Sequence, residues 1–286
     1  MEVNAISSED LGYICDLVRE RSAIVLEPEK AYLVQSRLEP LVKSERLGSL
    51  QDFVRTLRHQ PYGPLHKKVV EALTTNETSF FRDLVPFHAL RDHIFPALIK
   101  QNRSVQRLHI WCGASSSGQE PYSILFTMLD HFPELKSWQI RFMATDISRE
   151  MLIRCQEGYY SQLEVNRGLP APLLSKYFSK SGVGWKIRDD VRRKIEFREM
   201  NLAGTWLAFP KMDLVFLRNV MIYFDSQTKK RILENVRGIL ELHGYLVLGA
   251  SETTMNLDEH YARSAVGGTS VYRLKNGLEE RPYAVS

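Results

Sequence analysis

The chain has 286 residues, of which 44% are hydrophobic and 25% are charged, and its formal net charge is +4. These values are typical of a soluble globular protein with one large domain or two smaller ones. No apolar stretch is long enough to cross a bilayer and no signal-type segment follows Met1, so we expect a cytoplasmic protein without membrane insertion. The three cysteines are widely separated, and neither they nor the histidines have a spacing that indicates disulfides or a metal site.

Residues 1–73 carry only helical patterns, which predict a small all-helical domain. An amphipathic pattern opens at Ser8. Further helical stretches follow at Lys30 to Arg46, Leu50 to His59 and Leu65 to Leu73. Pro40 lacks an amide donor and crowds the preceding turn, so we expect it to kink or interrupt the second helix. Acidic residues dominate before Lys30 and basic residues after it, which indicates either solvated helix faces or a docking surface for an acidic partner.

From Arg107 onward, short apolar strand candidates alternate with helical patterns, which predicts an α/β fold. The strand candidates are Leu108 to Cys112, Gln139 to Thr145, Leu214 to Phe216, Tyr245 to Gly249 and Ser270 to Leu274, and the helices are Pro121 to His131, Arg149 to Glu157 and Lys229 to Leu242. Strands joined by helical crossovers form a mostly parallel sheet with helices on both faces, so we predict a doubly wound domain over residues 91–286.

The alternation stops between Gly158 and Met200, where short segments punctuated by glycine and proline take its place. Trp185 to Arg188 and Lys194 to Arg198 are strand candidates within this stretch. We therefore predict that residues 158–200 form a small antiparallel β-insertion in the doubly wound domain.

Two features at the ends of the first two predicted strands indicate a ligand site. The turn from Gly113 to Gly118 consists of small residues, which let a ligand approach the backbone, and Asp146 ends the second strand, where such folds use an acid to hold a ribose. The turn could also be merely tight, and Asp146 could cap the following helix. Together they favour an adenosine-containing cofactor, without distinguishing NAD from S-adenosylmethionine.

Four segments resemble the signature blocks of the chemotaxis receptor methyltransferases, the CheR family. They are Leu73 to Asp83, Gly118 to Ser123, Ala144 to Ile147 and Arg218 to Asp225, in the family's order. The resemblance extends from the N-terminal helices to Tyr272. It implies an all-helical N-terminal domain, a linker over residues 74–90 that carries cofactor contacts, and a Rossmann-like methyltransferase domain with an inserted antiparallel β-subdomain. It also implies transfer of methyl groups from S-adenosylmethionine to glutamate side chains of chemoreceptors.

The resemblance assigns roles to the matched positions. It implies that Glu120 accepts hydrogen bonds from the α-ammonium of S-adenosylmethionine and that Asp146 holds the ribose. Arg82, which contacts the methionine carboxylate, and Tyr223, which lies beside the sulfonium and the acceptor, are the catalytic candidates. The other cofactor-binding candidates are Asn76, Thr78, Asn201, Leu202, Arg218 and Asn219. From the residues alone, Arg218 would be a structural ion pair and Tyr223 a core aromatic.

The resemblance also points to the receptor's methylation helices as partners. A basic face is predicted to dock them, consisting of Arg37, Lys43, Arg46, Arg55 and Arg58. Some members of the family grip a C-terminal receptor peptide with a longer glycine-containing loop than the turn from Lys180 to Gly184. We therefore expect this protein not to depend on such a tether.

Three other functions were weighed against this one. A nucleic-acid methyltransferase would need a basic groove with interleaved aromatic residues, which is not found, so no nucleic acid is expected as a partner. A nicotinamide-dependent oxidoreductase would need the Gly-x-Gly-x-x-Gly pattern, which the turn lacks. A non-catalytic signalling module that binds S-adenosylmethionine could retain every cofactor residue, and methyl transfer to receptor fragments would distinguish it from the enzyme.

Overall fold

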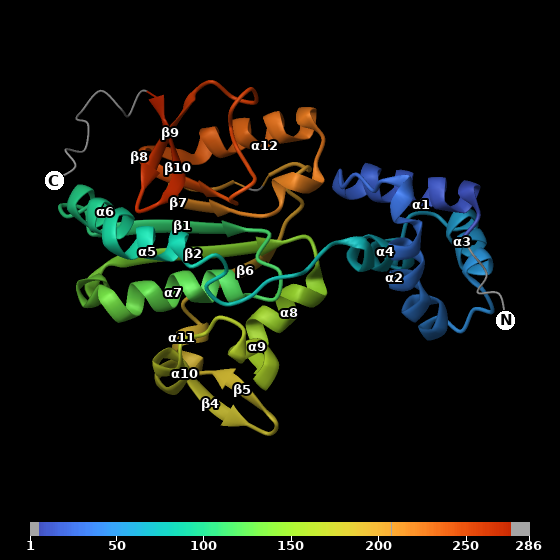
Figure 1. The fold of residues 1–286 in the computed structure, drawn as a ribbon, viewed down its shortest axis with the longest axis horizontal. Helices are drawn as coiled ribbons and strands as arrows, with labels where there is room; N and C mark the ends of the chain where they lie inside the picture. The colour runs from blue at the N-terminus through green and yellow to red at the C-terminus, as the bar shows by residue number, and fades with distance from the viewer. Residues whose placement is uncertain (1–5, 207, 276–286) are drawn as a thin grey trace. The chain divides into compact units, whose positions relative to one another are not determined.

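The computed structural model describes residues 6–206 and 208–275 (Figure 1). The chain separates into two compact units. The helical unit consists of Met1–Thr75 with Tyr223–Thr228, and the sheet unit consists of Asn76–Ile222 with Lys229–Ser286. The outer ends of the two predicted domains, residues 1–5 and 276–286, lie outside the described residues.

The helical unit contains the four predicted helices. They are α1 (Ser8–Ser22), α2 (Ala31–Ser44), α3 (Leu50–His59) and α4 (Pro64–Leu73), with a 3₁₀ turn η1 at Pro28–Lys30. Ser7 caps α1 by accepting a hydrogen bond from the Asp10 amide, and Ser49 caps α3. Their apolar faces meet in a core of fully buried side chains that includes Ile14, Leu38 and Phe53.

Helix α2 continues through Pro40, so the predicted interruption does not occur, while the alternative of a kink stays a prediction. Its buried positions Val34, Leu38 and Val42 recur every four residues and form one continuous stripe against the core. Pro40 lies on the exposed side of the helix. Burial of the stripe therefore holds the helix together across the hydrogen bond that proline removes.

The sheet unit is built on seven strands in the order β6-β2-β1-β7-β8-β10-β9. The strands are β1 (Arg107–Gly113), β2 (Gln139–Asp146), β6 (Glu196–Glu199), β7 (Met212–Leu217), β8 (Leu240–Leu248), β9 (Tyr261–Val266) and β10 (Thr269–Leu274). The first five in this order are parallel, while β10 pairs antiparallel with both β8 and β9. The predicted doubly wound sheet is confirmed.

Helices cover both faces of this sheet (Figure 1). They are α5 (Val85–Ala89), a π-helical turn η2 (Leu90–Ile94), α6 (Phe95–Gln101), α7 (Gln119–His131), α8 (Arg149–Glu157) and α12 (Ser226–Ile239), with 3₁₀ turns η3 (Pro133–Ser137) and η4 (Met221–Tyr223). The step from β1 to β2 and the step from β7 to β8 run in opposite directions along the sheet. Because parallel crossovers are right-handed, α7 and α12 lie on opposite faces. None of the helices in the described ranges is long and apolar enough to span a membrane.

The inserted segment is smaller than predicted, and one of its predicted strands lies elsewhere. The segment Lys194 to Arg198 was expected in the antiparallel insertion, but β6 pairs parallel with β2, with Met143 opposite Glu196. The insert sheet has the order β3-β5-β4 and consists of β3 (Tyr159–Ser161), β4 (Phe178–Ser181) and β5 (Gly184–Ile187). Three short helices accompany it: α9 (Gln162–Asn166), α10 (Ala171–Tyr177) and α11 (Asp189–Arg192). The alternating charges of β6 resemble an exposed strand because β6 is the edge of the main sheet.

Several other bounds differ from the predictions. Helix α7 begins at Gln119, two residues before Pro121, and the helix predicted to end at Leu242 ends at Ile239, where β8 begins. The helices between Val85 and Gln101 and the strand β9 were not predicted. These elements are short or lack strong periodicity, so their tertiary neighbours determine them.

An aromatic cluster attaches the insert to the segment that follows Asn76. Phe80 is 1% exposed, and its ring lies 5.0 Å from that of Tyr160 and 5.9 Å from that of Phe178 in edge-on contacts. Phe126 of α7 stacks on Tyr177 at 4.9 Å. The insert and residues 76–84 therefore share one apolar core with α7.

Candidate functional site

The turn between β1 and α7 lies at the carboxyl edge of the parallel strands. Its Ser115 amide donates to the carbonyl of Thr145 at the end of β2 over 2.9 Å, which holds the turn against the neighbouring strand. Gly118 has a φ of +96°, and a Cβ there would come within 2.9 Å of the Tyr160 hydroxyl and 3.0 Å of the Cys155 sulfur. Only glycine fits this position without moving the residues behind the turn.

Asp146 fixes the conformation of this turn. Its Oδ2 accepts the amide of Ser116 at 2.7 Å, its Oδ1 accepts the amide of Ser148 at 2.9 Å, and the residue is 6% exposed. The cap of α8 is Ser148, whose hydroxyl accepts the Met151 amide, so Asp146 is not the capping residue. Because each carboxylate oxygen can accept more than one hydrogen bond, Asp146 can anchor the turn and still receive a ligand hydroxyl.

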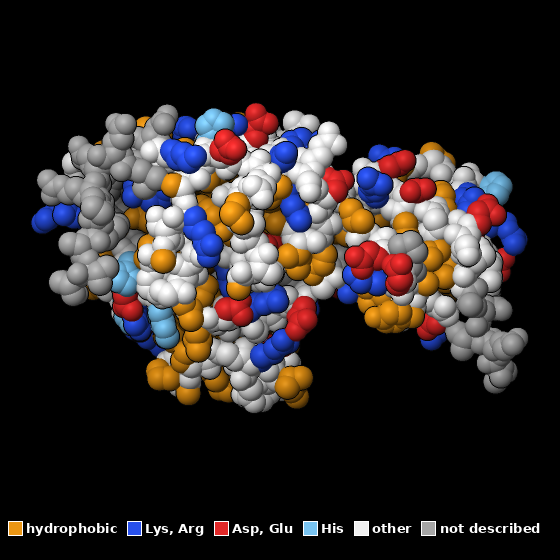
Figure 2. Space-filling view, turned by 45° about the horizontal axis from the view of Figure 1, so that its top comes forward, with side chains coloured by type: hydrophobic (Ala, Val, Ile, Leu, Met, Phe, Trp, Pro, Cys, Tyr) orange, Lys and Arg blue, Asp and Glu red, His pale blue; other side chains and the backbone are white. Residues whose placement is uncertain are grey.

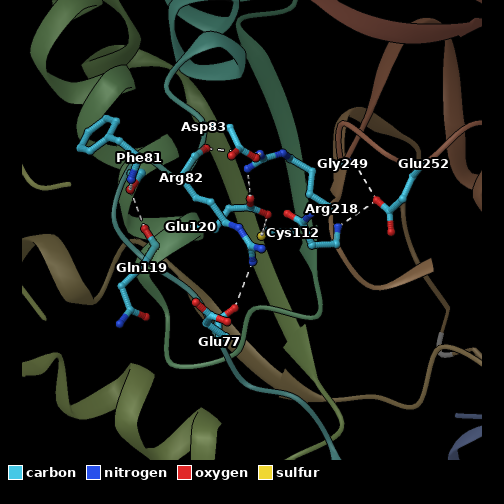
Figure 3. Close-up of polar contacts among 12 residues, drawn as sticks. Glu77, Phe81, Arg82, Asp83, Cys112, Gln119, Glu120, Arg218, Gly249 and Glu252 are labelled. Carbon is cyan, nitrogen blue, oxygen red and sulfur yellow. Dashed lines mark hydrogen bonds and ion pairs between the residues drawn. The ribbon is translucent and has the colours of Figure 1, made fainter. Parts of the chain in front are cut away.

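Arg218, which follows β7 directly, joins three separate parts of the chain (Figure 3). Its Nη1 lies 2.5 Å from Oε2 of Glu120 on α7, and its Nη2 lies 2.7 Å from Oδ2 of Asp83 and 3.3 Å from the carbonyl of Arg82. The Arg218 side chain is 1% exposed, and its Nε has no hydrogen-bond partner. We call Arg218, Glu120 and Asp83 the arginine cluster. One cation between two carboxylates leaves it with a formal charge of minus one.

The other side chain that contacts Glu120 is a buried thiol. Cys112 of β1 donates a weak hydrogen bond from its sulfur to Oε1 of Glu120 at 3.5 Å. Complete burial and the adjacent Glu120 carboxylate raise the pKa of the Cys112 thiol well above its ordinary value. Burial likewise raises the pKa of the Cys155 thiol and that of the half-buried Cys15 thiol. Cys112 therefore stays protonated and can serve Glu120 as a donor.

Residues 76–84 cross the carboxyl edge of the sheet between the turn and the insert. The carbonyl of Asn76 accepts a hydrogen bond from the Ser116 hydroxyl at 2.8 Å, which ties the segment to the turn. Arg82 is half-buried and donates from Nη1 to the carbonyl of Glu77 at 3.1 Å. A cavity of about 510 Å³ is lined by residues of this segment, including Thr78 and Arg82, together with Arg167 of the insert. We call it the segment pocket.

Asn201 and Leu202 reach the same edge from β6. The amide of Met200 donates to the carbonyl of Asp146 at 2.8 Å, which brings these residues next to the end of β2. The Asn201 side-chain oxygen accepts the amide of Ala203 at 3.0 Å, and Leu202 is 7% exposed. The residues after β6 therefore lie beside Asp146.

Glu252, a buried acid that was not predicted from the sequence, shapes the segment after β7. Its Oε2 accepts the amide of Gly249 at 2.7 Å (Figure 3). The same oxygen accepts the amide of Asn219 at 2.8 Å, and Oε1 accepts the amide of Ile222 at 3.3 Å. Asn219 has a left-handed φ of 56°, which this carboxylate holds in place. The only sequence signal is a single acid shortly after a strand, which is too common to identify the role.

Tyr223 belongs to the helical unit. Its carbonyl accepts the amide of Val25 at 2.9 Å, and next to it Ile24 and Phe224 form a β-bridge. The side chain is half-buried, and among the described residues its hydroxyl has no hydrogen-bond partner. Phe224 is buried, as are Phe80 and Phe81.

The five predicted docking residues do not form a uniform basic face. Arg37 donates to the carbonyls of Leu73 and Thr74 at the end of α4, and Arg55 pairs with Asp52. Arg58 pairs with Glu9 and Asp10 and lies over the ring of Tyr13. Lys43 and Arg46 are exposed, and neither has an ionic partner within residues 6–206 and 208–275. Figure 2 shows basic and acidic side chains interspersed over this unit.

The side chains at this edge of the sheet suit a ligand that contains adenosine and carries both a positive and a negative charge. The arginine cluster has a residual negative charge, Arg82 makes one hydrogen bond to a main-chain carbonyl among the described residues, and Asp146 lies beside a turn of small residues. Within the described ranges, no group of three or more His, Cys, Asp or Glu side chains is placed to hold a metal ion.

The fold and the site are those of a Rossmann-like domain that suits an adenosine-containing cofactor. Family comparison identifies it further: residues 9–74 match the all-alpha domain of CheR methyltransferases, and residues 76–268 match their S-adenosylmethionine binding domain. The chain therefore belongs to the CheR methyltransferase family. Membership in this family argues against the oxidoreductase alternative.

Curated relatives match most of the chain. It is 41% identical over 257 residues to the chemotaxis protein methyltransferase Cher2 of Pseudomonas putida, which covers 88% of this chain and 93% of the relative. Chemotaxis protein methyltransferase 1 of Pseudomonas aeruginosa is 42% identical over the same shares. Chemotaxis protein methyltransferase 1 of Vibrio cholerae is 37% identical over 96% of this chain and 100% of its own. The chain is thus an S-adenosylmethionine-dependent methyltransferase of chemotaxis.

Proposed function

We propose that this chain transfers the methyl group of S-adenosylmethionine to glutamate side chains of chemoreceptors in the cytoplasm and so forms methyl esters. The observation that supports this most strongly is the arginine cluster beside Arg82, in which Arg218 and Glu120 are buried and the formal charge is minus one. A site with one surplus negative charge suits the α-ammonium group of the cofactor. Arg82 supplies the complementary cation for the methionine carboxylate.

Each cofactor-binding candidate takes a role in this proposal that its surroundings support. Glu120 receives the α-ammonium on lone pairs that Arg218 and Cys112 leave free, and Arg218 holds the Glu120 side chain in its orientation. Asp146 accepts the ribose hydroxyls. The remaining contacts, to the adenine and the methionine portion, come from Asn76, Thr78, Asn201, Leu202 and Asn219.

The acceptor needs no general base. A glutamate side chain has a reference pKa of about 4.3 and is ionised at neutral pH, so it is already a nucleophile. The cofactor supplies a methyl group made electrophilic by the sulfonium, and the protein has to align the acceptor carboxylate with it. Tyr223, whose hydroxyl has no partner among the described residues, orients the acceptor in this proposal and does not deprotonate it.

Receptor recognition involves the basic side chains of the helical unit. Among the five predicted docking residues, Lys43 and Arg46 are exposed and have no ionic partner in the described part of the chain, so they offer charge to acidic methylation helices at the smallest cost. Arg37, Arg55 and Arg58 would first have to leave their own partners. The turn between β4 and β5 is short, with Val183 at its tip 87% exposed, and we propose that no C-terminal receptor peptide has to bind beside it.

A radiolabel experiment tests the proposed reaction. The purified chain is incubated with S-adenosylmethionine labelled in its methyl group and a cytoplasmic receptor fragment from the same organism. We expect label in the fragment that alkali releases as methanol, because carboxyl esters hydrolyse whereas methylated amines do not. A fragment with glutamine in place of the acceptor glutamates is the control. Alkali-stable label contradicts the proposal, and cofactor binding without any transfer supports the non-catalytic alternative.

A further inference from the structure

An exposed ion pair lies beside the segment pocket. Nη2 of Arg167 lies 2.6 Å from Oε1 of Glu77, with the two side chains 60% and 63% exposed. Arg167 follows α9 of the insert, and Glu77 belongs to the segment 76–84. Both line the segment pocket. In the described part of the chain, Nε and Nη1 of Arg167 have no partner, so most of its donors are free to bind something else.

The insert does not need this ion pair to stay in place. Gly168 packs so closely that a Cβ would lie 2.1 Å from the carbonyl oxygen of Phe80, and its φ is +92°. The Phe80 ring is buried against Tyr160 and Phe178. Burying one such ring stabilises by about 1.5–3 kcal/mol, whereas an exposed ion pair contributes about 0–1 kcal/mol. Backbone contact and aromatic burial therefore fix Arg167, and its side chain can exchange partners at small cost.

The Glu77 side chain shows that a carboxylate can bind next to Arg167. Its side chain bonds to Arg167, while its carbonyl accepts a hydrogen bond from Arg82 (Figure 3). The hydrogen bond and charge of Arg167, with the charge of Arg82 added, lower the pKa of the Glu77 carboxyl. A carboxylate thus sits between two guanidinium groups at the rim of the segment pocket.

We propose that Arg167 binds a carboxylate of the acidic receptor segment that carries the acceptor, and that Glu77 occupies this position until the receptor displaces it. This inference rests on the proposed function and adds a specificity residue to it. The arriving carboxylate can use the free Nε and Nη1 in a bidentate contact, whereas Glu77 uses Nη2 alone. Glu77 is then an internal competitor that keeps Arg167 from weaker anionic ligands.

Two substitutions should change the KM for a receptor fragment in opposite directions. Arg167→Ala should raise the KM for a receptor fragment about two- to fivefold, the range of an exposed ion pair, and Arg167→Lys should give a smaller increase. Glu77→Gln should lower that KM by a similar factor, because the competitor loses its charge. In the double variant Glu77→Gln should have no effect, since Arg167 is absent. The turnover number, the affinity for the cofactor and the melting temperature should not change.

Control variants come from another exposed ion pair of the same insert. Arg188 lies 3.2 Å from Asp190, and their side chains are 55% and 64% exposed. Arg188→Ala and Asp190→Asn make the same changes of charge away from the segment pocket, and we expect neither to alter the KM. They separate local recognition from a general effect of net charge.

The inference is wrong if the two substitutions change the KM in the same direction. If Arg167→Ala and Glu77→Gln both raise the KM, or both lower the melting temperature, the ion pair merely fastens the insert, and if neither changes the KM it is only solvated surface. Binding of the fragment in the presence of S-adenosylhomocysteine, followed by fluorescence anisotropy, tests the same order of affinities without turnover. Absence of methyl transfer then counts against the proposed function alone, whereas absence of binding, or affinities in another order, counts against the role of Arg167.

Discussion

Strand β7 (Met212–Leu217) has a buried charged residue at each end, and the two differ in how completely they are paired. Near its start, Asp213 accepts three hydrogen bonds: from Nδ2 of Asn102 and the amide of His109 at 2.7 Å each, and from Nε2 of His243 at 2.9 Å. Just after its end, Arg218 pairs with two carboxylates and retains an unpartnered Nε.

The difference indicates which end of the sheet is built for stability and which for binding. Asp213 ties the starts of β1, β7 and β8 together, and its three hydrogen bonds all come from groups of the protein itself. The arginine cluster has a surplus negative charge, and Asp83 within it is 48% exposed. Incomplete pairing of buried charge is costly for folding and useful for recognition.

The largest expected effect comes from removing the cation of the arginine cluster. Arg218→Ala leaves Glu120 and Asp83 without compensation, and we expect the free energy of unfolding to fall by about 3 kcal/mol or more, with loss of methylation. Urea denaturation and the radiolabel assay measure the two effects. Arg188→Ala, which removes an exposed cation, should change stability by no more than about 0.5 kcal/mol. If Arg218→Ala were as stable as Arg188→Ala, the proposed difference between the two ends of β7 would be wrong.

Asp213→Ala should destabilise by about 1–3 kcal/mol because buried donors lose their acceptor, yet it should leave the KM for S-adenosylmethionine unchanged. Burial raises the pKa of the Asp213 carboxyl, but hydrogen bonds from His243, His109 and Asn102 together lower it by more. The resulting pKa therefore lies below the ordinary value.

A depressed folded-state pKa makes the stabilisation by Asp213 depend on pH. It is present above the unfolded value of about 3.9 and is lost as the pH falls through the folded pKa. The unfolding free energy of wild type should therefore drop more steeply below about pH 4 than that of Asp213→Asn. Parallel pH profiles for the two proteins would show that the carboxylate is not a stabilising group.

Arg82→Lys should reduce activity while leaving stability nearly unchanged. Arg82 makes one hydrogen bond to a carbonyl, so its loss should alter the free energy of unfolding by no more than about 0.5 kcal/mol. An ammonium group cannot reproduce the planar fork for a carboxylate, and we expect about a tenfold loss in kcat/KM. Equal proportional losses in melting temperature and activity would instead mark Arg82 as a structural residue.

The smallest effect is expected at the exposed cations of the helical unit. Reversing the charge of Lys43 and Arg46 to glutamate should raise the KM for the receptor about two- to fivefold and leave cofactor affinity unchanged. Added salt should weaken binding of wild type more than that of the variant, because screening acts on exposed charges. Identical salt dependence would show that these side chains are only solvated surface.

Strands and helices could be predicted wherever the apolar residues of a segment follow a clear strand or helix pattern. The apolar runs of β1 and β2 and the amphipathic α1 are examples, because burial of their own side chains decides their structure. The place of β6 could not be predicted in this way. Its charges alternate as in a solvated hairpin, and only its pairing with β2 reveals it as an edge strand of the main sheet.

The candidate site was predicted residue by residue, but not how its residues pair. Resemblance named Glu120 and Arg218, which lie 98 positions apart in the sequence, and their ion pair follows from the meeting of α7 with the end of β7. Glu252 was missed for the same reason, since it acts through the backbone amides of a distant segment. Such pairings depend on long-range topology, which local spacing does not encode.

The helical unit has one further consequence for how the chain can be divided. Residues 223–228 belong to it although residues on both sides of them belong to the sheet unit, and the Ile24–Phe224 bridge and the Arg19–Asp225 ion pair hold them there. A fragment that ends at Thr75 would lose the strand partner of Ile24, and a fragment that begins at Asn76 would expose Phe224. A cut between Thr75 and Asn76 therefore divides the helical unit itself, because residues 223–228 stay with the other fragment.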